Sequence, residues 1–524
     1  MKAVQAAEAE AAKAAQALAA ARKQLAPVDG PLAAKRKQLA ETEQRLAEAE
    51  RREQSLTQRY AKLKPEVEKL RTEYVAARRA ADRALIAAGK LVSFAESVAP
   101  IFVKRCLACH NARTAKGRLN LETFASLMAG GESGVVIEPG DPDASVLVAM
   151  VEDGSMPKDA DPLTPEQIAV IRKWVATGAR LDAGIDPHAK LFDIAPKEPQ
   201  PLPPETYPVA VPITALAFSP DGKWLAASGY HEVILWDAQS GRRVRRITNV
   251  AERVHGIAFS PDGSLLGVAA GTPGQMGELK LFASADGKLV ADLVTTADSM
   301  LAVAFDAKGE RVACAGADRS VFVFDVAQKR RVLEIQDHAD WVMGVAWSPD
   351  GKKLVTAARD KTCKVFDAAS GEALVTFNGH TDAVYAAAFA PDGKSVVSAG
   401  RDKQLRVWKP SDGKQIRAIG GFGGEIFMLA VSPDGHVFSA CEDKNVREHE
   451  IGSGKALRTY TGHSDWVFSV AVHAASKRVA AGGINGEVVV WDTSNGKVVL
   501  RFVAAPGLNR LEGESGQAKE QKPR

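Results

Sequence analysis

The sequence is poor in cysteine, in aromatic residues and in net charge. It has 5 cysteines among 524 residues, 6% aromatic residues, and 68 basic against 64 acidic side chains. So few cysteines argue against a disulfide scaffold, and a net charge of +4 gives no reason to expect nucleic acid or an anionic membrane as partner. No apolar run approaches the roughly 18 residues of a membrane span. The composition is that of globular protein, and the length leaves room for two to four domains.

Two of the five cysteines stand in the most informative stretch, Cys106-Leu-Ala-Cys109-His110. Random placement of these residue types produces this pattern in about one such chain in a thousand. Cys-x-x-Cys-His is the pattern of covalent c-type haem attachment, in which two thiols add to the porphyrin vinyl groups. On a helix, positions i, i+3 and i+4 share one face, so His110 would lie beneath the iron as an axial ligand. We therefore predict one covalently attached haem c, with a thioredoxin-like thiol pair as the alternative.

A second axial ligand is expected after the attachment helix, because cytochromes c with His/Met ligation take a thioether from an extended loop. Met156 stands in such a loop, and Pro157 biases it away from helical geometry. The competing candidates are Met128, Met150 and His188; the two methionines lie in apolar helical contexts where packing is their usual role. Met156 and His110 are thus the predicted iron ligands.

Helix signals surround this motif. Ser93-x-x-Glu96 is a capping box that predicts a helix from Phe94 to about Cys109. Thr164-Pro165-Glu-Gln167 starts another, with Ile168, Ile171 and Val175 on one face and Gly178 at its end. Gly-rich turns at 130–134 and 139–143 and a short helix at 145–151 lie between them. Residues 91–182 are therefore expected to form a small all-α domain.

Several of these segments together resemble the planctomycete-type cytochrome c domain. They are Cys-Leu-Ala-Cys-His, Gly-Gly-Glu-Ser-Gly, Pro-Gly-Asp-Pro-Asp-Ala-Ser, Ser-Met-Pro and Leu-Thr-Pro-Glu-Gln-Ile, between about Phe94 and Ala179. By this resemblance, haem binding transfers to Cys106, Cys109, His110 and Met156. The family pattern ends Met-Pro-Pro, whereas Lys158 stands here in place of the second proline. The resemblance implies haem binding and electron transfer, and no substrate.

Residues 1–90 consist mainly of strong helix formers. Leucines recur every seven residues at 32, 39 and 46 and again at 56, 63 and 70, with a stammer between the two sets. Pro27-Val-Asp-Gly30-Pro31 predicts that a short first helix folds back on a long second one, and Pro65 is a possible further break. We expect a coiled-coil hairpin that self-associates, with a dimer as the first expectation and a self-contained monomeric hairpin as the alternative.

A proline-rich stretch at 183–208 predicts a semi-rigid extended linker. Beyond it the residues Trp236, Phe282, Phe324, Phe366, Trp408, His449 and Trp491 recur at steps of 46, 42, 42, 42, 41 and 42. This period, with Ser-Pro-Asp-Gly turns and Trp-Asp ends, resembles the WD40 repeat, which implies a seven-bladed β-propeller over 209–505. We expect its first strand at Ile213–Ser219, its last at Val498–Phe502, a possible edge strand at Tyr207–Val211, and a disordered tail at 506–524.

The propeller's recurring polar residues are expected to be structural. His380, Ser398, Asp402 and Trp408 match the hydrogen-bonded tetrad of the WD40 family, and His338, Thr356 and Asp360 repeat it with Phe366 in place of tryptophan. The aspartate position holds Tyr230, Met276 and Asn485 in the first, second and last repeats. A set that repeats every 42 residues belongs to the scaffold, so we expect no catalysis there. The other cysteines, at 314, 363 and 441, are expected to be buried free thiols.

These features predict a multidomain, extracytoplasmic c-type cytochrome for single-electron transfer, with the propeller as a protein-docking platform. Lys104, Arg105, Arg113, Lys116 and Arg118 could steer an acidic redox partner. A haem-based sensor and a redox enzyme that uses the haem as electron relay are the alternatives, and the sixth ligand distinguishes the sensor. Because haem is attached outside the bacterial cytoplasm, an export signal is expected; residues 1–22 lack its apolar region, so we expect it to lie outside this sequence.

Overall fold

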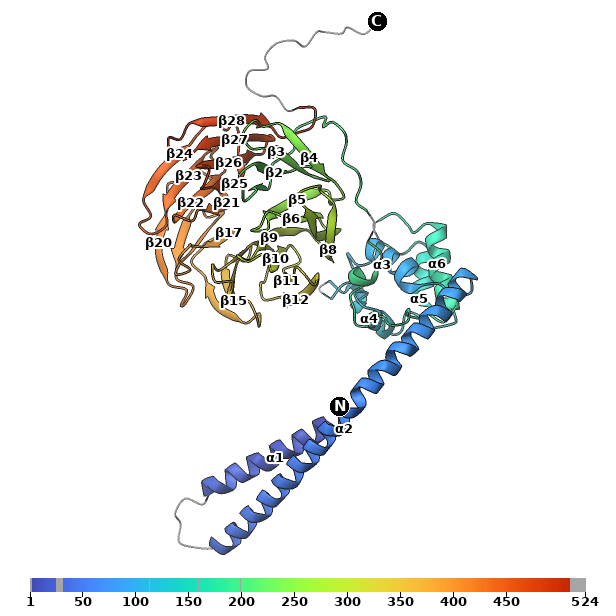
Figure 1. Ribbon diagram of the computed structural model, residues 1–524. Coiled ribbons are helices and arrows are strands. Elements are labelled where there is room, and N and C mark those ends of the chain that lie inside the picture. The colour runs from blue at the N-terminus through green and yellow to red at the C-terminus, as the bar shows by residue number, and fades with distance from the viewer. Residues whose placement is uncertain (1, 25–31, 113, 159, 198, 509–524) are drawn as a thin grey trace. The chain divides into compact units, whose positions relative to one another are not determined.

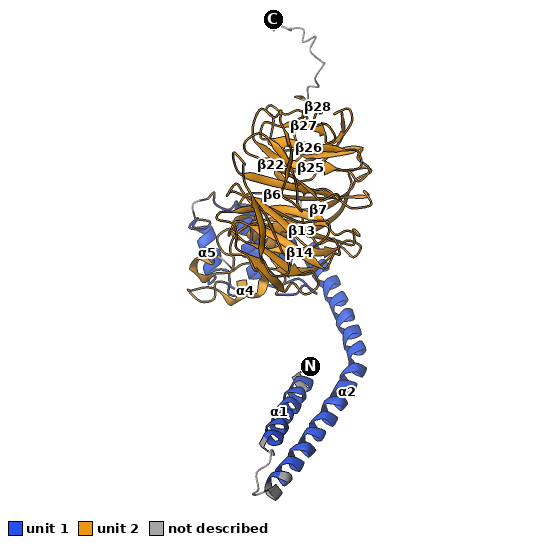
Figure 2. Ribbon diagram, turned by 90° about the vertical axis from the view of Figure 1, so that its left-hand side faces the viewer, with its two compact units in different colours: residues 1–98, 137–156, 162–187 blue, residues 99–136, 157–161, 188–524 orange. Residues whose placement is uncertain are grey.

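The computed structural model describes residues 2–24, 32–112, 114–158, 160–197 and 199–508. The chain divides into two compact units, coloured separately in Figure 2. Unit 1 comprises residues 1–98, 137–156 and 162–187, and unit 2 comprises residues 99–136, 157–161 and 188–524. No helix among the described residues is long and apolar enough to span a membrane.

Unit 1 begins with the predicted helical hairpin. Helix α1 (Lys2–Gln24) runs beside the first half of α2 (Leu32–Ala87), as Figure 1 shows. Ion pairs Arg22–Glu43 (3.6 Å) and Arg52–Glu10 (3.7 Å) set an antiparallel register. The predicted break at 27–31 lies outside the described residues. The possible break at Pro65 is wrong, because α2 continues through this residue. All its neighbours there are exposed, so water can bond the carbonyl that Pro65 leaves without a donor.

The remainder of unit 1 is a small helical core. It contains the π-helical turn η1 (Phe94–Val98), α5 (Val146–Glu152) and α6 (Pro165–Ala176). Thr164 and Gln167 form the predicted capping box of α6, and Trp174 packs its buried ring 5.2 Å from that of Phe94. The end of α2 joins this core, since Arg79 Nε donates to the carbonyl of Ala183 (2.9 Å). Three predicted features, the Thr164 cap, helix 145–151 and the hairpin, are thus confirmed.

The helical part of unit 2 holds the cysteine motif. It consists of α3 (Ala99–Arg105), the 3-10 turn η2 (Lys116–Arg118), α4 (Phe124–Ala129) and α7 (Leu191–Ile194). The prediction of one helix from Phe94 to about Cys109 is wrong in two respects: a π turn precedes α3, and α3 ends at Arg105. Pro100, which has no N–H, sits at the start of α3 and forces the chain to begin a new helix there.

The proline-rich stretch lies along the propeller for much of its length. Lys197 Nζ pairs with Asp292 (2.6 Å), the amide of Gln200 donates to Asn249 Oδ1 (2.8 Å), and Tyr207 Oη donates to the buried Glu232 (2.7 Å). Tyr207 also receives the chain end, since its amide donates to the carbonyl of Pro506 (2.8 Å). Residues 207–211 form no strand. The stretch is extended, as expected, but it is hydrogen-bonded to the propeller rather than spanning open solvent.

The propeller consists of seven four-stranded sheets, visible as the ring in Figure 1. We number them as blades 1 to 7 in chain order. Their strands are β1 (Leu216–Phe218), β2 (Trp224–Ser228), β3 (Val233–Asp237), β4 (Arg243–Ile247); β5 (Arg253–Phe259), β6 (Leu265–Thr272), β7 (Met276–Ala283), β8 (Leu289–Thr296); β9 (Met300–Phe305), β10 (Arg311–Gly316), β11 (Val321–Asp325), β12 (Arg330–Ile335); β13 (Val342–Trp347), β14 (Lys353–Ala358), β15 (Cys363–Asp367), β16 (Ala373–Phe377); β17 (Val384–Phe389), β18 (Val396–Gly400), β19 (Leu405–Trp408), β20 (Gln415–Ile419); β21 (Ile426–Val431), β22 (His436–Cys441), β23 (Val446–Glu450), β24 (Ala456–Tyr460); β25 (Val467–His473), β26 (Arg478–Gly483), β27 (Glu487–Asp492), β28 (Val498–Val503).

Each blade uses four consecutive antiparallel strands, so the seven-bladed prediction is confirmed. The seven residues that define the repeat all lie buried on the third strand of their blade. β28 completes blade 7 from the C-terminal side, and no strand from the N-terminal side enters that sheet, as predicted. Cys314, Cys363 and Cys441 are buried free thiols, also as predicted.

The predicted tetrad is complete in blade 5. His380 bonds Asp402 through Nδ1 (2.9 Å) and Ser398 through Nε2 (2.8 Å), while Trp408 Nε1 donates to Ser398 Oγ (3.1 Å). Blade 4 repeats it with His338 between Asp360 (2.8 Å) and Thr356 (2.6 Å), beside Phe366. The buried polar side chains of these two sets thus hydrogen-bond to one another, which indicates a structural role.

Blades 1 and 2 replace the tetrad with buried ion pairs. In blade 2, Glu278 and Lys280 lie 2.8 Å apart with side chains only 2–3% exposed, and Gln200 donates to Glu278 (3.2 Å). In blade 1, Glu232 is held by Arg246 and Tyr207. In both blades a residue of the proline-rich stretch, Gln200 or Tyr207, therefore donates a hydrogen bond to the buried glutamate.

Candidate functional site

The backbone around Cys106, Cys109 and His110 forms closely hydrogen-bonded turns. The amides of Cys109 and His110 both donate to the carbonyl of Cys106, at 3.2 and 3.0 Å. The amide of Cys106 donates to the carbonyl of Phe102 (2.9 Å), which continues the bonding pattern of α3 beyond its end. The three predicted residues are therefore brought together on one turn, although not within a regular helix.

The chain after the motif folds back onto it. The amide of Lys116 donates to the carbonyl of Cys109 (3.2 Å), and the amide of Leu121 donates to that of His110 (2.8 Å). A bend of this kind needs unusual backbone angles, and Ala115 takes a φ of 34° at it. Below the turn, Phe102 and Leu107 are buried at 1% exposure. The motif is thus fixed on one side by α3 and on the other by its own return loop.

The environments of His110 and Cys106 bear on the two interpretations of the motif, haem attachment and a thioredoxin-like thiol pair. His110 Nδ1 is buried and has no hydrogen-bond partner, although an imidazole in a metal site has both ring nitrogens engaged. Burial raises the pKa of the Cys106 thiol to about 12, and the nearby charge of Arg105 opposes this only in part. A thioredoxin-like pair needs the opposite, a lowered thiol pKa. The raised thiol pKa argues against a thioredoxin-like pair, and haem attachment at these residues stays a prediction.

Met156 lies in the loop between α5 and α6, where the sequence predicted it. Its amide donates to the carbonyl of Met150 (3.0 Å), and the turn before it is closed by Asp153 Oδ1, which accepts from the amide of Ser155 (2.8 Å). Met156 belongs to unit 1 and His110 to unit 2. Their joint ligation of iron stays a prediction. His188 is exposed, and Met128 is half-buried in α4.

Helix α5 presents an apolar face that nothing in unit 1 covers. Val146 and Met150, one helical turn apart, are 39% and 41% exposed, whereas Leu147, Val148 and Val151 on its other side are buried. The expectation that Met150 packs in a core is therefore wrong, because the core takes the other face of this short helix. Val146 and Met150 thus form a short uncovered apolar strip on α5, the helix that precedes the Met156 loop.

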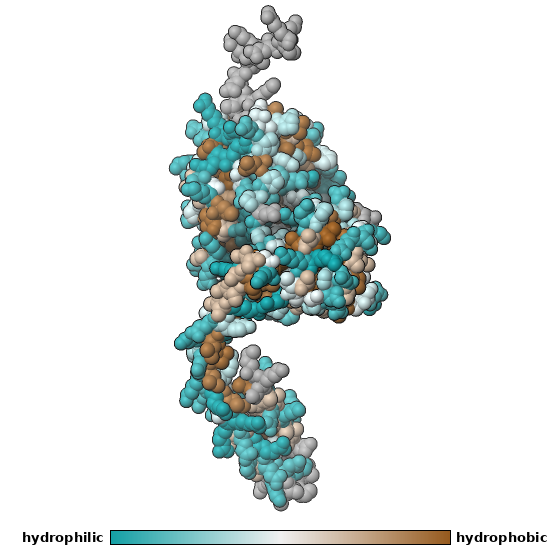
Figure 3. All heavy atoms as spheres, turned by 90° about the vertical axis from the view of Figure 1, so that its right-hand side faces the viewer, coloured by the Kyte–Doolittle hydropathy of each residue, from teal (hydrophilic) through white to brown (hydrophobic). Residues whose placement is uncertain are grey.

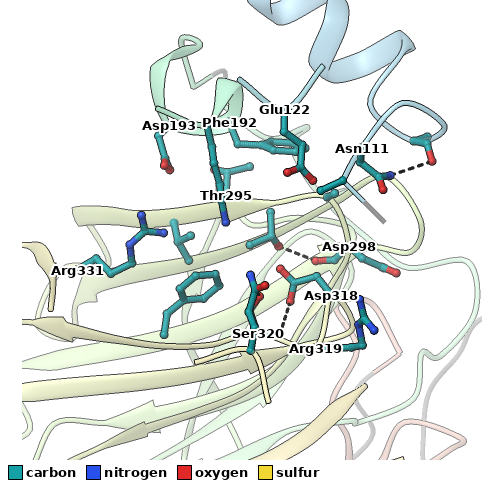
Figure 4. A pocket seen from close by; sticks show the side chains of 18 of the residues that line it. Asn111, Glu122, Phe192, Asp193, Thr295, Asp298, Asp318, Arg319, Ser320 and Arg331 are labelled. Carbon is teal, nitrogen blue, oxygen red and sulfur yellow. Dashed lines mark hydrogen bonds between the residues drawn. The ribbon is translucent and has the colours of Figure 1, made fainter. Parts of the chain in front are cut away.

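A cavity of about 390 Å³ in unit 2 lies between the motif's return loop and the propeller, and Figure 4 shows it. Asn111, directly after His110, lines it together with Glu122 and Phe192. The propeller contributes Asp298 and Asp318. Burial raises the pKa of Asp318, whose Oδ1 accepts from the amide of Ser320 (3.0 Å). The cavity is lined by side chains of both charge signs, among them Asp298, Asp318, Arg319 and Arg331, together with apolar residues such as Val294.

The propeller has its own opening at the centre of the ring. Its innermost strands line a cavity of about 530 Å³. Tyr385, Phe427 and Phe468 form an aromatic cluster on its wall, with ring centroids 5.9 and 4.7 Å apart. His255 lies in the same wall with Nε2 buried and unpartnered, and burial lowers its pKa to about 4. Sequence reasoning missed these residues, because single positions on innermost strands carry no periodic signal.

Two protein-family models match different parts of the chain. A family model described as planctomycete cytochrome C matches residues 106–160. The model of the WD domain, G-beta repeat, matches residues 206–237, 329–367, 371–409 and 454–492. These four matches cover strands of every blade except blade 2, although in blades 3 and 6 they reach the last strand alone.

Curated relatives match parts of the propeller repeats. An uncharacterised WD repeat-containing protein of Deinococcus radiodurans is 45% identical over 56 residues, which are 10% of this chain and 21% of the relative. THO complex subunit 6 of Arabidopsis thaliana is 33% identical over 81 residues, 16% of this chain and 22% of the relative. A WD repeat-containing protein of Synechocystis is 30% identical over 97 residues, 18% and 27%. The chain thus spans about a quarter of the length of these relatives.

The matched residues coincide with the described features. The cytochrome match begins at Cys106 and reaches past Met156, and the repeat matches fall on strands of the seven-bladed ring. The chain therefore joins a planctomycete cytochrome c segment to a WD40-repeat β-propeller of seven blades.

Proposed function

We propose that this protein is an extracytoplasmic c-type cytochrome that carries one haem for single-electron transfer. The observation that carries the proposal is the turn that brings Cys106, Cys109 and His110 together, at the start of the segment similar to planctomycete cytochrome C. Cys106 and Cys109 would hold the haem by thioether bonds, and His110 would be the first axial ligand. A haem held there supplies an iron that gains and loses one electron.

A residue outside the motif would complete the proposed site. Met156 would be the second axial ligand, and a thioether opposite an imidazole favours low-spin iron with a raised potential, which suits a carrier.

The propeller would dock protein partners, among them a redox partner. Two tryptophans at turns that precede innermost strands are exposed, Trp341 at 37% and Trp466 at 40%. Arg359 lies 4.7 Å from the ring of Trp341, and exposed Trp beside Arg is the composition of binding hot spots. Lys116 and Arg118 are exposed after the cysteine motif, where they would attract an acidic redox partner. Electron transfer needs such docking to bring a donor or acceptor near the haem.

The absorption spectrum of the full chain, produced with export and haem attachment, tests this proposal. We expect haem to remain bound after denaturation, a low-spin reduced spectrum, and no change on adding carbon monoxide. Cys106→Ala/Cys109→Ala should abolish the covalent haem, whereas Cys314→Ala, a buried propeller thiol, should not. A chain that matures without haem would overturn the proposal.

The second ligand needs its own variants. Met156→Ala should open the iron to carbon monoxide and lower the reduction potential, since the soft thioether favours ferrous iron. Met128→Ala is the matched control and should leave the spectrum unchanged. If Met156→Ala leaves the spectrum unchanged and His188→Ala alters it, the iron has two histidine ligands and a sensor becomes the better assignment.

A further inference from the structure

Residues 57–74 of α2 carry exposed apolar side chains in a regular pattern. Helix α1 is antiparallel to α2, and its Glu10 lies opposite Arg52. The start of α1, eight residues before Glu10, therefore lies at the level of about residue 60 of α2. From Val75 onward α2 approaches the unit 1 core, since Val75 Cγ1 lies within 2.5 Å of where a side chain of Gly184 would begin. Residues 57–74 are exposed in between. Glu68, Arg71 and Thr72 line a pocket with residues 184–187, but the large apolar side chains of the stretch remain exposed.

The exposed apolar residues of this stretch follow a heptad. They are Tyr60, Leu63, Val67, Leu70 and Tyr74, exposed by 40%, 53%, 57%, 57% and 64%. Their steps of three and four place Tyr60, Val67 and Tyr74 at position a and Leu63 and Leu70 at position d. Figure 3 shows apolar side chains gathered on this part of the helix. We call these five residues the α2 seam.

A single helix in water cannot bury such a stripe, and its geometry fits another helix of the same kind. Polar and charged residues occupy the rest of the stretch, and Pro65 falls at position f, on the face opposite the seam. β-branched residues at a with leucine at d favour two strands; Val67 and the two leucines follow this pattern, whereas Tyr60 and Tyr74 do not. We propose that the α2 seam pairs with the same seam of a second copy of this chain in a parallel two-stranded coiled coil.

The charges beside the seam favour a second copy in parallel orientation. Glu66 and Glu73 occupy g positions, while Lys64, Arg71 and Arg78 occupy e positions. In a parallel pair, g of one helix faces e of the next heptad of the other. Glu66 then faces Arg71, against one like-charged contact of Arg59 with Lys64, while Arg78 is already bonded to the carbonyl of Leu181 and paired with Asp82.

An antiparallel pair centred on Val67 has the less favourable charges. There e faces e and g faces g, so Lys64 opposes Arg71 and Glu66 opposes its own copy. Only Arg59 and Glu73 then attract each other. Each contact is weak at a solvent-exposed edge, but the sum decides between two orientations that bury the same apolar residues.

Sedimentation of the full chain tests the pairing, which does not depend on the haem assignment. The wild type should sediment as a dimer at micromolar concentration. Leu63→Asp/Leu70→Asp should halve the mass and raise the dissociation constant more than about 100-fold. Ala61→Asp/Thr72→Asp adds the same charge at positions b and f and should leave the dimer intact. Circular dichroism and the haem spectrum check that each variant is folded.

Charge exchange and cross-linking test the orientation. Glu66→Arg and Arg71→Glu should each weaken the dimer, and the two together should restore it, since only a parallel pair brings these positions together. Tyr74→Cys should cross-link two copies on oxidation, whereas the wild type should not. A monomeric wild type, or a dimer that survives Leu63→Asp/Leu70→Asp, would overturn the pairing. The parallel orientation would be wrong if Tyr60→Cys chains cross-link to Tyr74→Cys chains while Tyr74→Cys chains do not cross-link to one another.

Discussion

Two histidine side chains in this protein have opposite surroundings: His380 is buried, and His110 is half-buried. In blade 5, both ring nitrogens of His380 are bonded within the chain, to Asp402 and Ser398 at 2.9 and 2.8 Å. In the cysteine motif, the buried Nδ1 of His110 has no partner. A buried polar atom without a partner costs free energy unless something outside the chain engages the group. The difference separates a histidine that holds a scaffold from one placed to bind a ligand.

An unpartnered nitrogen alone does not identify a ligand site. His255 and His449 in the propeller also have a buried ring nitrogen without a hydrogen bond. Neither has cysteines at motif spacing, and burial lowers the pKa of both, which keeps their rings neutral. The assignment of His110 therefore rests on the thiols of Cys106 and Cys109 as much as on its own environment.

Replacing each of the two histidines, His110 and His380, by alanine should have the largest effect. His110→Ala should abolish the low-spin haem spectrum and leave unfolding of the propeller unchanged. His380→Ala should leave the haem spectrum intact and destabilise the propeller. Spectra and denaturant unfolding of the same two variants measure both properties. If either variant alters both properties together, the two histidines do not have separate roles.

Removing the carboxylate of the blade 5 network should have the next largest effect. Asp402→Ala leaves the buried Nδ1 of His380 without a partner, removes the carboxylate that pairs with Arg406, and should lower the free energy of unfolding by about 3 kcal/mol. Asp392→Ala, in an exposed turn of the same blade where the carboxylate accepts one backbone N–H, is the matched control. It should cost about 0.5–1 kcal/mol. Denaturant midpoints measure both, and equal costs would show that the network adds nothing.

Converting blade 5 to the blade 4 pattern should have a smaller effect. Trp408→Phe removes the Nε1 donor to Ser398 and part of the ring stacked on Phe377 at 4.8 Å. We expect a loss of about 1–2 kcal/mol, because one hydrogen bond and some packing disappear while the imidazole–carboxylate pair remains. Unfolding experiments test it, and a stabilised variant would contradict this view of the tryptophan.

The smallest effect should appear in the acid dependence of stability. Burial would raise the pKa of Asp402, but the hydrogen bond and charge of His380 outweigh it and lower this pKa; Asp360 beside His338 behaves likewise. A lowered folded-state pKa contributes stability above the unfolded value of about 3.9 and loses it as the pH falls through the folded value. Denaturant midpoints should therefore decline below about pH 4, and less steeply in Asp360→Asn/Asp402→Asn.

Periodic features could be predicted from the sequence in detail. The 42-residue repeat located the third strand of all seven blades, including those of blades 2, 3 and 6, which lie outside the repeat matches. The repeat works because each blade is built from neighbours in the chain, so its aromatic position recurs even where the tetrad has been lost. The same locality made the hairpin and the capping box at Thr164 predictable.

Features that depend on distant segments were not predictable in the same way. Counting leucines alone missed Tyr60, Val67 and Tyr74 in the α2 seam and assigned the seam to the whole of α2. Only the register of α1 shows which part is covered. The contacts of Lys197 and Gln200 with the propeller were likewise invisible, because their partners Asp292 and Asn249 are far away in the chain.

The sequence by itself determined the chemistry of the cysteine motif, the number of blades and the helical hairpin. Those features need only the spacing of residues within one turn, one blade or one pair of helices. The tertiary structure decided which apolar face of α2 is exposed and which histidine rings are satisfied. Burial and hydrogen-bond satisfaction are set by whatever segment packs against a side chain, and that segment can come from anywhere in the chain.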